Sequence, residues 1–185
     1  MTNTFSASGF TVTRRIAIDA GHRIMTHGSK CRHLHGHRYG IEAICRAVDG
    51  RLHQQGEQTG MVLDFAFLKE EMLAEIDQPC DHGFIAALED RELLTMFAPP
   101  ELPLEAWLDE VGGAVAANGH CIPQRCRLQT KLYVVPFQPT AECLARHWFE
   151  RLVSRVTLRS GGLAALMEVR VAETPNCVAS FAISG

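Results

Sequence analysis

The chain has 185 residues, of which 46% are hydrophobic and 21% are charged. A chain of this size and composition forms one ordinary globular domain that buries a core without disulfides or a structural metal. Its 18 Lys and Arg residues against 21 Asp and Glu residues give a net charge of −3, which argues against nucleic acid or an anionic membrane as a partner. No stretch is apolar over the ~18 residues that a membrane span needs, and residues 1–15 lack the apolar segment of a signal peptide. We therefore expect a cytoplasmic protein.

The cysteines favour the same compartment. They are odd in number and contain no pair with CxxC spacing, which suits free thiols in a reducing environment better than a disulfide framework. The seven are Cys31, Cys45, Cys80, Cys121, Cys126, Cys143 and Cys177.

The chain begins with two predicted strands. Apolar residues alternate with polar ones over residues 9–22 and again over 39–47, and a loop containing Gly28 lies between the two segments. A period of two is typical of a strand that buries one face. We expect these two strands to be antiparallel neighbours.

Two helices and two further strands follow. Asp64 can cap a helix that ends before Pro79, and Thr140 can cap a second helix with apolar residues on one side. Beyond a Gly-Gly break, alternation predicts strands over 167–173 and 177–183, joined as a hairpin. The predicted order is strand, strand, helix, helix, strand, strand.

Residues 83–137 separate the two helices. They contain two amphipathic stretches, Glu89–Ala98 and Leu104–Ala117, and a possible strand at Leu128–Val135. No repeat and no linker marks a second domain. We predict a single α+β domain over residues 1–185, interrupted by a helical insertion at 83–137.

Five of the nine histidines lie between residues 22 and 37. In a strand, His35 and His37 point to the same side, and Gly36 leaves room between them. His22, at the end of the neighbouring strand, can supply a third imidazole. Three histidines with an open fourth position are typical of catalytic zinc. His33 shares the parity of the pair, and spacing alone leaves it open as a ligand.

The other histidines carry the simpler interpretation of solvated or locally bonded side chains: His27, His53, His120 and His147. Cys31 lies four residues before His35, between Lys30 and Arg32, and spacing leaves open whether it is a metal ligand or a base whose thiolate these cations favour.

Two acidic residues are candidates for chemistry. Asp81 precedes His82, and a carboxylate beside an imidazole can orient a group that transfers protons. Glu173 continues the apolar face of the strand at 167–173, where a carboxylate is costly unless it is paired. The alternative for Glu173 is that the strand has ended and the side chain is solvated.

Several motifs together resemble the family of 6-pyruvoyl tetrahydropterin synthase and 6-carboxytetrahydropterin synthase. The matches follow the order of the family through almost the whole chain outside the insertion. They are Asp19-Ala20-Gly21-His22-Arg23, the Cys31 to His37 run followed by Tyr39, Gly60 to Phe65 leading to Leu68-Lys69, Asp81-His82, Pro139-Thr140-Ala141-Glu142 and Glu173-Thr174.

The resemblance implies the tunnelling fold (T-fold), an antiparallel four-stranded sheet with two helices on one face. In this family such units assemble around a barrel and place active sites at subunit interfaces. It thus implies a homo-oligomer built on trimers. The chain departs from the family in the length of residues 83–137, in the residues after His82, and in Cys143 after the Pro-Thr-x-Glu motif.

The resemblance also implies roles for single residues. The family's zinc ligands correspond to His22, His35 and His37, and its proton-abstracting base corresponds to Cys31. The histidine at His82, helped by Asp81, belongs to a proton relay. The glutamate at Glu173 anchors the pterin ring, and the threonine at Thr140 lines that pocket. The cofactor implied is Zn²⁺.

The spacing Cys-x-x-x-His-Gly-His resembles the 6-carboxytetrahydropterin branch of the queuosine pathway. This branch converts 7,8-dihydroneopterin triphosphate to 6-carboxy-5,6,7,8-tetrahydropterin, with release of acetaldehyde and triphosphate. The alternatives are a 6-pyruvoyl tetrahydropterin synthase, which eliminates triphosphate, and a non-catalytic zinc-stabilised pterin-binding homologue. The retention of Cys31, His82 and Glu173 speaks against the last.

Overall fold

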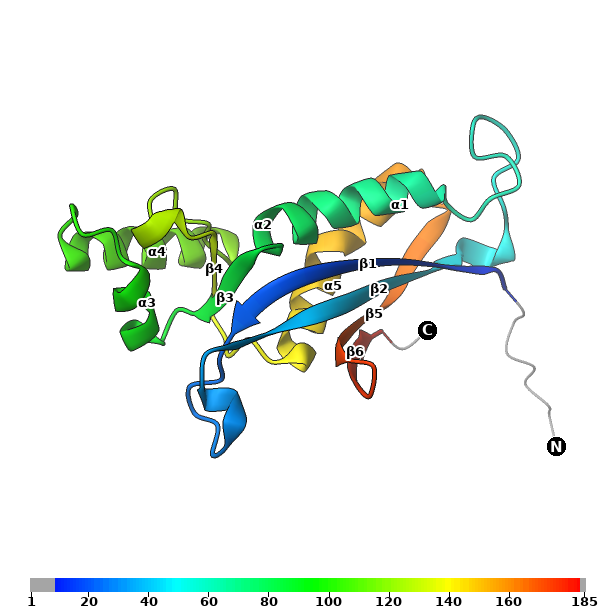
Figure 1. Cartoon of the computed structure of the whole chain (residues 1–185). Coiled ribbons are helices and arrows are strands. Elements are labelled where there is room, and N and C mark those ends of the chain that lie inside the picture. Colours follow the sequence, from blue (N-terminus) through cyan, green and yellow to red (C-terminus); the bar gives the residue numbers. More distant parts are fainter. Residues whose placement is uncertain (1–8, 184–185) are drawn as a thin grey trace.

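The fold is α+β and is built on one curled sheet (Figure 1). The computed structural model describes residues 9–183. Its sheet has six strands in the order β4-β3-β1-β2-β5-β6. The strands are β1 (Thr11–His22), β2 (His35–Ala47), β3 (Gly83–Ala87), β4 (Leu132–Val135), β5 (Ala164–Thr174) and β6 (Cys177–Ala182). The expected description as four antiparallel strands is incomplete, because β3 and β4 extend the sheet and run parallel to β1.

The long strands β1 and β2 set the frame of the molecule. They pair antiparallel over their whole lengths, with Ile16 opposite Ile41 and Ile18 opposite Tyr39. All four of these side chains are buried, because a period of two places them on the same face. Strand β2 begins at His35, four residues earlier than the alternation predicts, so that the His-Gly-His segment is part of the sheet.

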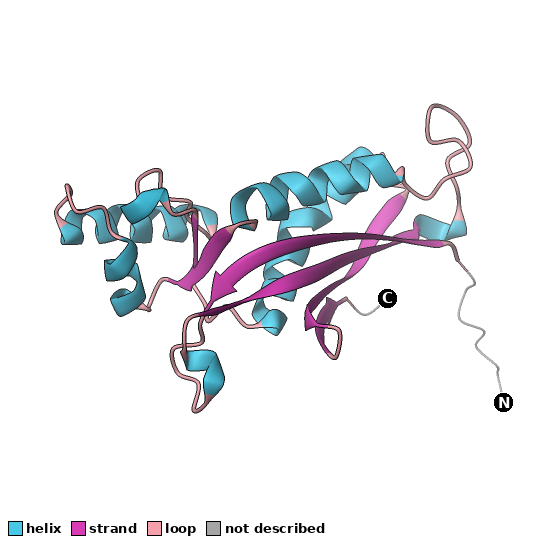
Figure 2. Ribbon diagram, in the orientation of Figure 1, coloured by secondary structure: helices cyan, strands magenta, loops and turns pink. Residues whose placement is uncertain are grey.

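Two helical segments cover this apolar face (Figure 2). Helix α1 (Phe65–Met72) begins where the carboxylate of Asp64 accepts a hydrogen bond from the backbone N–H of Ala66, and it continues through a π-helical turn into α2 (Gln78–Cys80). Helix α5 (Ala141–Arg159) begins at Thr140. Both predicted caps are confirmed.

The insertion is not purely helical. It holds β3, then α3 (Arg91–Phe97) and α4 (Leu104–Asn118), and then β4. Its helices bury Leu93, Leu94, Trp107, Val111 and Val115 in a second hydrophobic cluster.

The insertion and the rest of the domain share strands β3 and β4. Ile85 and Tyr133 face the main core, whereas their neighbours Ala86 and Val134 face the second cluster. This alternation follows from the period of two in a strand. The insertion is thus built into the sheet. Within residues 9–183, no helix is both long and apolar enough to cross a membrane.

Candidate metal centre and pocket

The pairing of β1 with β2 brings three histidines together. His22 ends β1 opposite His35, and His37 lies opposite Ala20. One ring nitrogen from each of the three histidines lies within 4.8 Å of those of the other two. A Cβ atom on Gly36 would lie only 3.0 Å from the carbonyl oxygen of Ala20, so glycine allows the close approach of the two strands here.

Backbone carbonyls fix the protonation of two of these rings. The carbonyl oxygen of Pro139 lies 2.8 Å from Nδ1 of His22, and that of His33 lies 2.8 Å from Nδ1 of His35. A carbonyl only accepts hydrogen bonds, so both Nδ1 atoms carry the proton in the neutral ring. The two Nε2 atoms are then unprotonated, and they lie 3.1 Å apart. Two lone pairs that face each other at this distance repel unless a cation lies between them.

Burial favours the neutral form of two of the three histidines. Burial, followed by the neighbouring imidazoles His35 and His37, lowers the pKa of His22 to about 4 against an opposing contribution from the Pro139 carbonyl. Burial also lowers the pKa of His37. Three imidazoles with converging ring nitrogens, two of them held at Nδ1 by backbone carbonyls, are a donor set that zinc prefers. The residues therefore fit a zinc ion.

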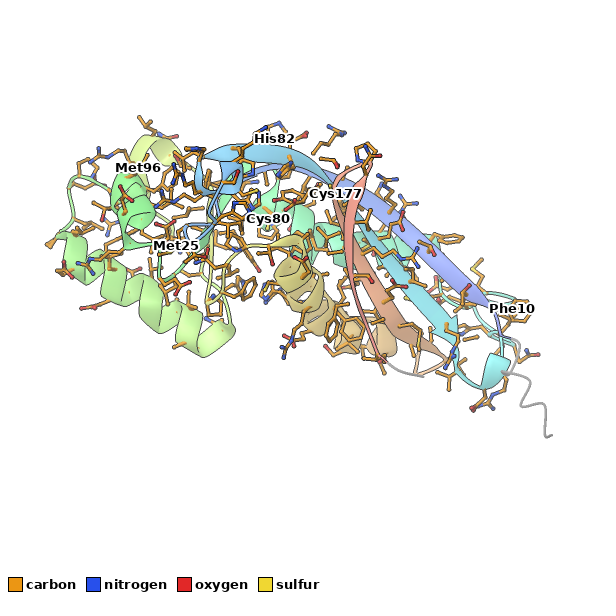
Figure 3. The ribbon with its side chains drawn as sticks, turned by 90° about the horizontal axis from the view of Figure 1, so that it is seen from below. Phe10, Met25, Cys80, His82, Met96 and Cys177 are labelled. Atoms are coloured by element: carbon orange, nitrogen blue, oxygen red, sulfur yellow. The ribbon has the colours of Figure 1, made fainter. Side chains whose placement is uncertain are left out.

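A pocket of about 390 Å³ opens beside His22. It collects side chains from the loop after β1, the start of α5 and the β5–β6 hairpin. Its lining consists of His22, Ile24, His27, Cys31, Thr140, Ala141, Glu142, Glu173, Cys177, Val178 and Ala179. Figure 3 shows Cys177 on the hairpin at the start of β6.

Three of the predicted site residues line this pocket together with His22. Cys31 lies in the 3₁₀ turn Lys30–Arg32, and its carbonyl oxygen accepts a hydrogen bond from the backbone N–H of Ile24. The Glu173 side chain is 24% exposed, and its Oε1 lies 3.9 Å from Nε2 of His22. Glu173 is thus half-buried at the site rather than solvated beyond the strand. Thr140 lines the pocket while it caps α5.

Asp81 and His82 form a dyad outside the lining of this pocket. Nδ1 of His82 lies 2.7 Å from Oδ2 of Asp81, whose Oδ1 accepts a hydrogen bond from the backbone N–H of Asp19. That N–H and then the His82 ring lower the pKa of Asp81. The His82 side chain is 79% exposed. The structure therefore orients the His82 imidazole but leaves it facing solvent. It lies outside the pocket that Cys31 and Glu173 line.

Two histidines near the site differ from the expectations drawn from the sequence, which left His33 open as a ligand and treated His27 as a solvated or locally bonded side chain. His33 is exposed. Within residues 9–183, the group that could hold a metal consists of His22, His35 and His37 and does not include His33. His27 and Cys177 also line the pocket, although no motif or spacing in the sequence indicated either residue. Both reach the pocket through loop and hairpin geometry, which no local pattern encodes.

Comparison with known proteins agrees with the fold. Residues 11–183 match the family model of 6-pyruvoyl tetrahydropterin synthase. The chain belongs to the 6-pyruvoyl tetrahydropterin synthase family, and it is an enzyme of the lyase type.

Individual relatives refine this assignment. A 6-carboxy-5,6,7,8-tetrahydropterin synthase from Rickettsia felis is 32% identical over 165 residues, which cover 89% of this chain and 94% of the relative. The fold is shared with an uncharacterized protein from Wolinella succinogenes, with a TM-score of 0.68, 21% identity and coverage of 95% and 98% of the two chains. It is also shared with the Caenorhabditis elegans 6-pyruvoyl tetrahydropterin synthase, with a TM-score of 0.55, 21% identity and coverage of 98% and 100%.

Proposed function

We propose that this enzyme converts 7,8-dihydroneopterin triphosphate and water to 6-carboxy-5,6,7,8-tetrahydropterin, acetaldehyde and triphosphate, in a zinc-dependent reaction of the queuosine pathway in the cytoplasm. One observation carries the proposal. The three convergent histidines adjoin a pocket that also holds a thiol, Cys31, and a carboxylate, Glu173. These are a metal site, a base and an acceptor for the pterin ring.

The metal would be held by His22, His35 and His37. Zn²⁺ bound by these three histidines keeps a fourth position open, through which it would acidify the hydroxyl groups of the substrate side chain. The chain's own contribution is to present three imidazoles, with Nδ1 of His22 and of His35 held by backbone carbonyls.

Cys31 and Glu173 divide the remaining work in the pocket. The Cys31 thiolate accepts the proton that leaves a side-chain carbon of the substrate. The Glu173 carboxylate accepts hydrogen bonds from the ring N–H groups of the pterin, and this pairing compensates the burial of its charge. Thr140 contributes to the wall of the same pocket.

The Asp81–His82 dyad would complete the site from a neighbouring subunit. It is held in one orientation by Asp19 and is exposed, but it does not line the pocket of its own chain. An exposed proton-transfer group serves the reaction if a second copy brings it to a pocket. This supports a homo-oligomer built on trimers with active sites at subunit interfaces, as the resemblance implies. In such an assembly His82 would relay protons to and from the Cys31 region.

Two observations favour the 6-carboxytetrahydropterin reaction over triphosphate elimination alone. Three residues separate Cys31 from the His35-Gly36-His37 segment, which is the spacing of that branch. The relative from Rickettsia felis, which is named for the 6-carboxy product, matches most of the chain.

Product analysis tests the proposal. Zinc-loaded protein is incubated with 7,8-dihydroneopterin triphosphate, and every product is identified. We expect acetaldehyde, triphosphate and 6-carboxy-5,6,7,8-tetrahydropterin in equal amounts. Triphosphate without acetaldehyde would instead establish the 6-pyruvoyl reaction, and no turnover would favour a pterin-binding protein without catalysis.

Light scattering of the active sample tests the assembly. A trimer-based oligomer has a mass that is a multiple of three times the 20.5 kDa of one chain. Full activity in a sample whose mass is that of one chain would refute both the interface site and the role of a neighbouring His82.

A further inference from the structure

We propose that a corner of the insertion, Glu89 with Asp90, positions the metal ligand His22. The corner lies between β3 and α3, and its two residues belong neither to the pocket lining nor to the three-histidine group. It holds the two chain segments that determine where the His22 ring lies. The inference rests on the proposed metal site, and it gives the insertion a role in that site.

The first segment is the residue that follows His22. The guanidinium of Arg23 donates two hydrogen bonds to the Asp90 carboxylate, from Nε to Oδ2 at 2.6 Å and from Nη2 to Oδ1 at 2.5 Å. The Asp90 side chain is only 3% exposed and that of Arg23 is 18% exposed. A bidentate pair of this kind fixes both direction and distance. It ties the end of β1 to the insertion, immediately beside the metal ligand.

The second segment carries the carbonyl that orients the His22 ring. Pro139 provides that carbonyl. In the preceding residue, Gln138, both the nitrogen and the oxygen of the side-chain amide make hydrogen bonds. Its Nε2 donates to the carboxylate of Glu89, and its Oε1 accepts from the backbone N–H of Met25 at 3.1 Å. Gln138 thereby connects the insertion, the loop after β1 and the carbonyl that holds the Nδ1 proton of His22.

The two contacts act on one ring from two directions. Through Arg23, the corner sets where β1 ends, and through Gln138 it sets where the Pro139 carbonyl lies. Outer contacts that orient a metal-bound histidine typically change metal affinity 10–100-fold when they are removed. Nη2 of Arg23 also donates to the Glu92 carboxylate at 3.2 Å. The charge of Arg23 is therefore paired with carboxylates of the insertion.

Asp90→Asn is the main test, because it separates two functions of this side chain. Oδ1 of Asp90 also accepts a hydrogen bond from the backbone N–H of Leu93 and so caps α3. Asparagine caps a helix as well as aspartate does, but it lacks the charge that pairs with Arg23. Glu89→Gln is the second variant, at an exposed position where folding is not at risk. Glu105→Gln is the control, since it removes an exposed ion pair with Arg91, next to Asp90, without removing a hydrogen bond to Arg23 or Gln138.

Zinc affinity is measured on the full-length proteins by competition with a chromogenic chelator. The visible absorption spectrum of the Co²⁺-loaded proteins reports the geometry around the metal. We expect Asp90→Asn to weaken zinc binding about 10–100-fold and to alter the Co²⁺ spectrum. Glu89→Gln should change both in the same direction by less. Glu105→Gln should stay within about twofold of the wild type, as expected for a surface pair.

The outcomes separate this inference from the proposed function. Wild-type zinc affinity and an unchanged Co²⁺ spectrum in both Asp90→Asn and Glu89→Gln would overturn the positioning role while leaving the metal site intact. A wild-type protein that binds no zinc would overturn the metal site, and the positioning role with it. If Asp90→Asn does not fold, Glu89→Gln decides the question by the same two measurements.

Discussion

Two groups of histidines lie in this molecule, and they differ in what their ring nitrogens face. The first is the site group of His22, His35 and His37. The second group joins His147 on α5 to Tyr133 on β4 and to His120, which follows α4. Burial lowers the pKa of both His22 and His147 to about 4. A low pKa therefore does not distinguish a metal ligand from a histidine of the core.

The hydrogen-bond partners do distinguish the two groups. Nε2 of His147 faces the hydroxyl of Tyr133 at 2.7 Å, and Nδ1 of His120 lies 3.1 Å from the guanidinium of Arg151 and 3.2 Å from the carbonyl oxygen of Asn118. A hydroxyl can donate or accept, a guanidinium donates and a carbonyl accepts, so each of these nitrogens has a protein partner whether or not it carries a proton. The site group instead directs the lone pairs of His22 and His35 at each other. The first group can hold a metal ion, whereas the second pairs its ring nitrogens with protein groups.

Removing a histidine from each group gives the largest contrast. We expect His37→Ala to lose zinc and all turnover, because two imidazoles remain where catalytic zinc needs three protein ligands. His120→Ala and His147→Gln should retain one zinc per chain. Metal analysis after dialysis checks this, and full zinc occupancy in His37→Ala would break the distinction between the two groups.

Cys31→Ala tests whether Cys31, which lies beside the site group, is the base of the reaction or a ligand of the metal. As the base, Cys31 can be removed without loss of zinc or pterin binding, and turnover should fall about 10²–10⁴-fold in the chemical step. As a ligand, its loss would release metal, and activity would follow zinc occupancy. Single-turnover kinetics on the zinc-replete variant make the distinction. Turnover at the wild-type rate would remove Cys31 from the mechanism.

Much of the site group could be predicted from the sequence, because its information is local. Alternation located β1 and most of β2, and the His-Gly-His spacing placed two imidazoles on one face. Apolar alternation alone starts this strand at Tyr39, because His35-Gly36-His37 is polar, and the His-x-His spacing is what indicates a strand over these residues. The Arg23–Asp90 pair joins residues 67 positions apart, and no local pattern records such a contact.

The insertion was harder to predict for a different physical reason. Strands β3 and β4 are short, and their side chains are buried in two cores at once. A strand buried on both faces has no polar alternation, so its sequence is a brief apolar run that fits a helix or a strand equally well. The helices α3 and α4 match the predicted amphipathic stretches and β4 lies within the possible strand predicted at Leu128–Val135, whereas β3 has no counterpart in the prediction. That the insertion extends the sheet is known only from the structure.

The pH dependence of stability sharpens the comparison of the buried histidines. Burial, then Arg151 and His120, lower the pKa of His147 from 6.5 to about 4. The unfolded chain therefore binds a proton at His147 at a higher pH than the folded chain does. The stability that the buried neutral ring of His147 contributes is fully present above pH 6.5 and is lost as the pH falls toward 4. The shift corresponds to roughly 3 kcal/mol at most.

Urea unfolding of zinc-free protein at pH 7 and pH 4 measures this loss. Zinc-free samples are needed because metal binding to the site group adds its own pH dependence. His22 contributes to the acid sensitivity of both proteins, so the comparison between wild type and His147→Gln isolates His147. We expect the variant to lose less of its unfolding free energy over this interval. An equal loss in both proteins would show that His147 does not titrate as a buried neutral ring.

Tyr133→Phe should have the smallest effect, and one confined to the second group. Burial raises the pKa of Tyr133, so its hydroxyl keeps its proton and pairs with Nε2 of His147. Phenylalanine fills the same space in the main core but leaves that buried nitrogen without a partner, which costs about 1–3 kcal/mol. Because the hydroxyl joins β4 to α5 and does not line the pocket, zinc affinity and turnover should remain those of the wild type. Chemical denaturation measures the loss, and chelator competition measures the metal. A fall in zinc affinity without a fall in stability would mean that the second group acts on the metal site, and the separation of the two groups would fail.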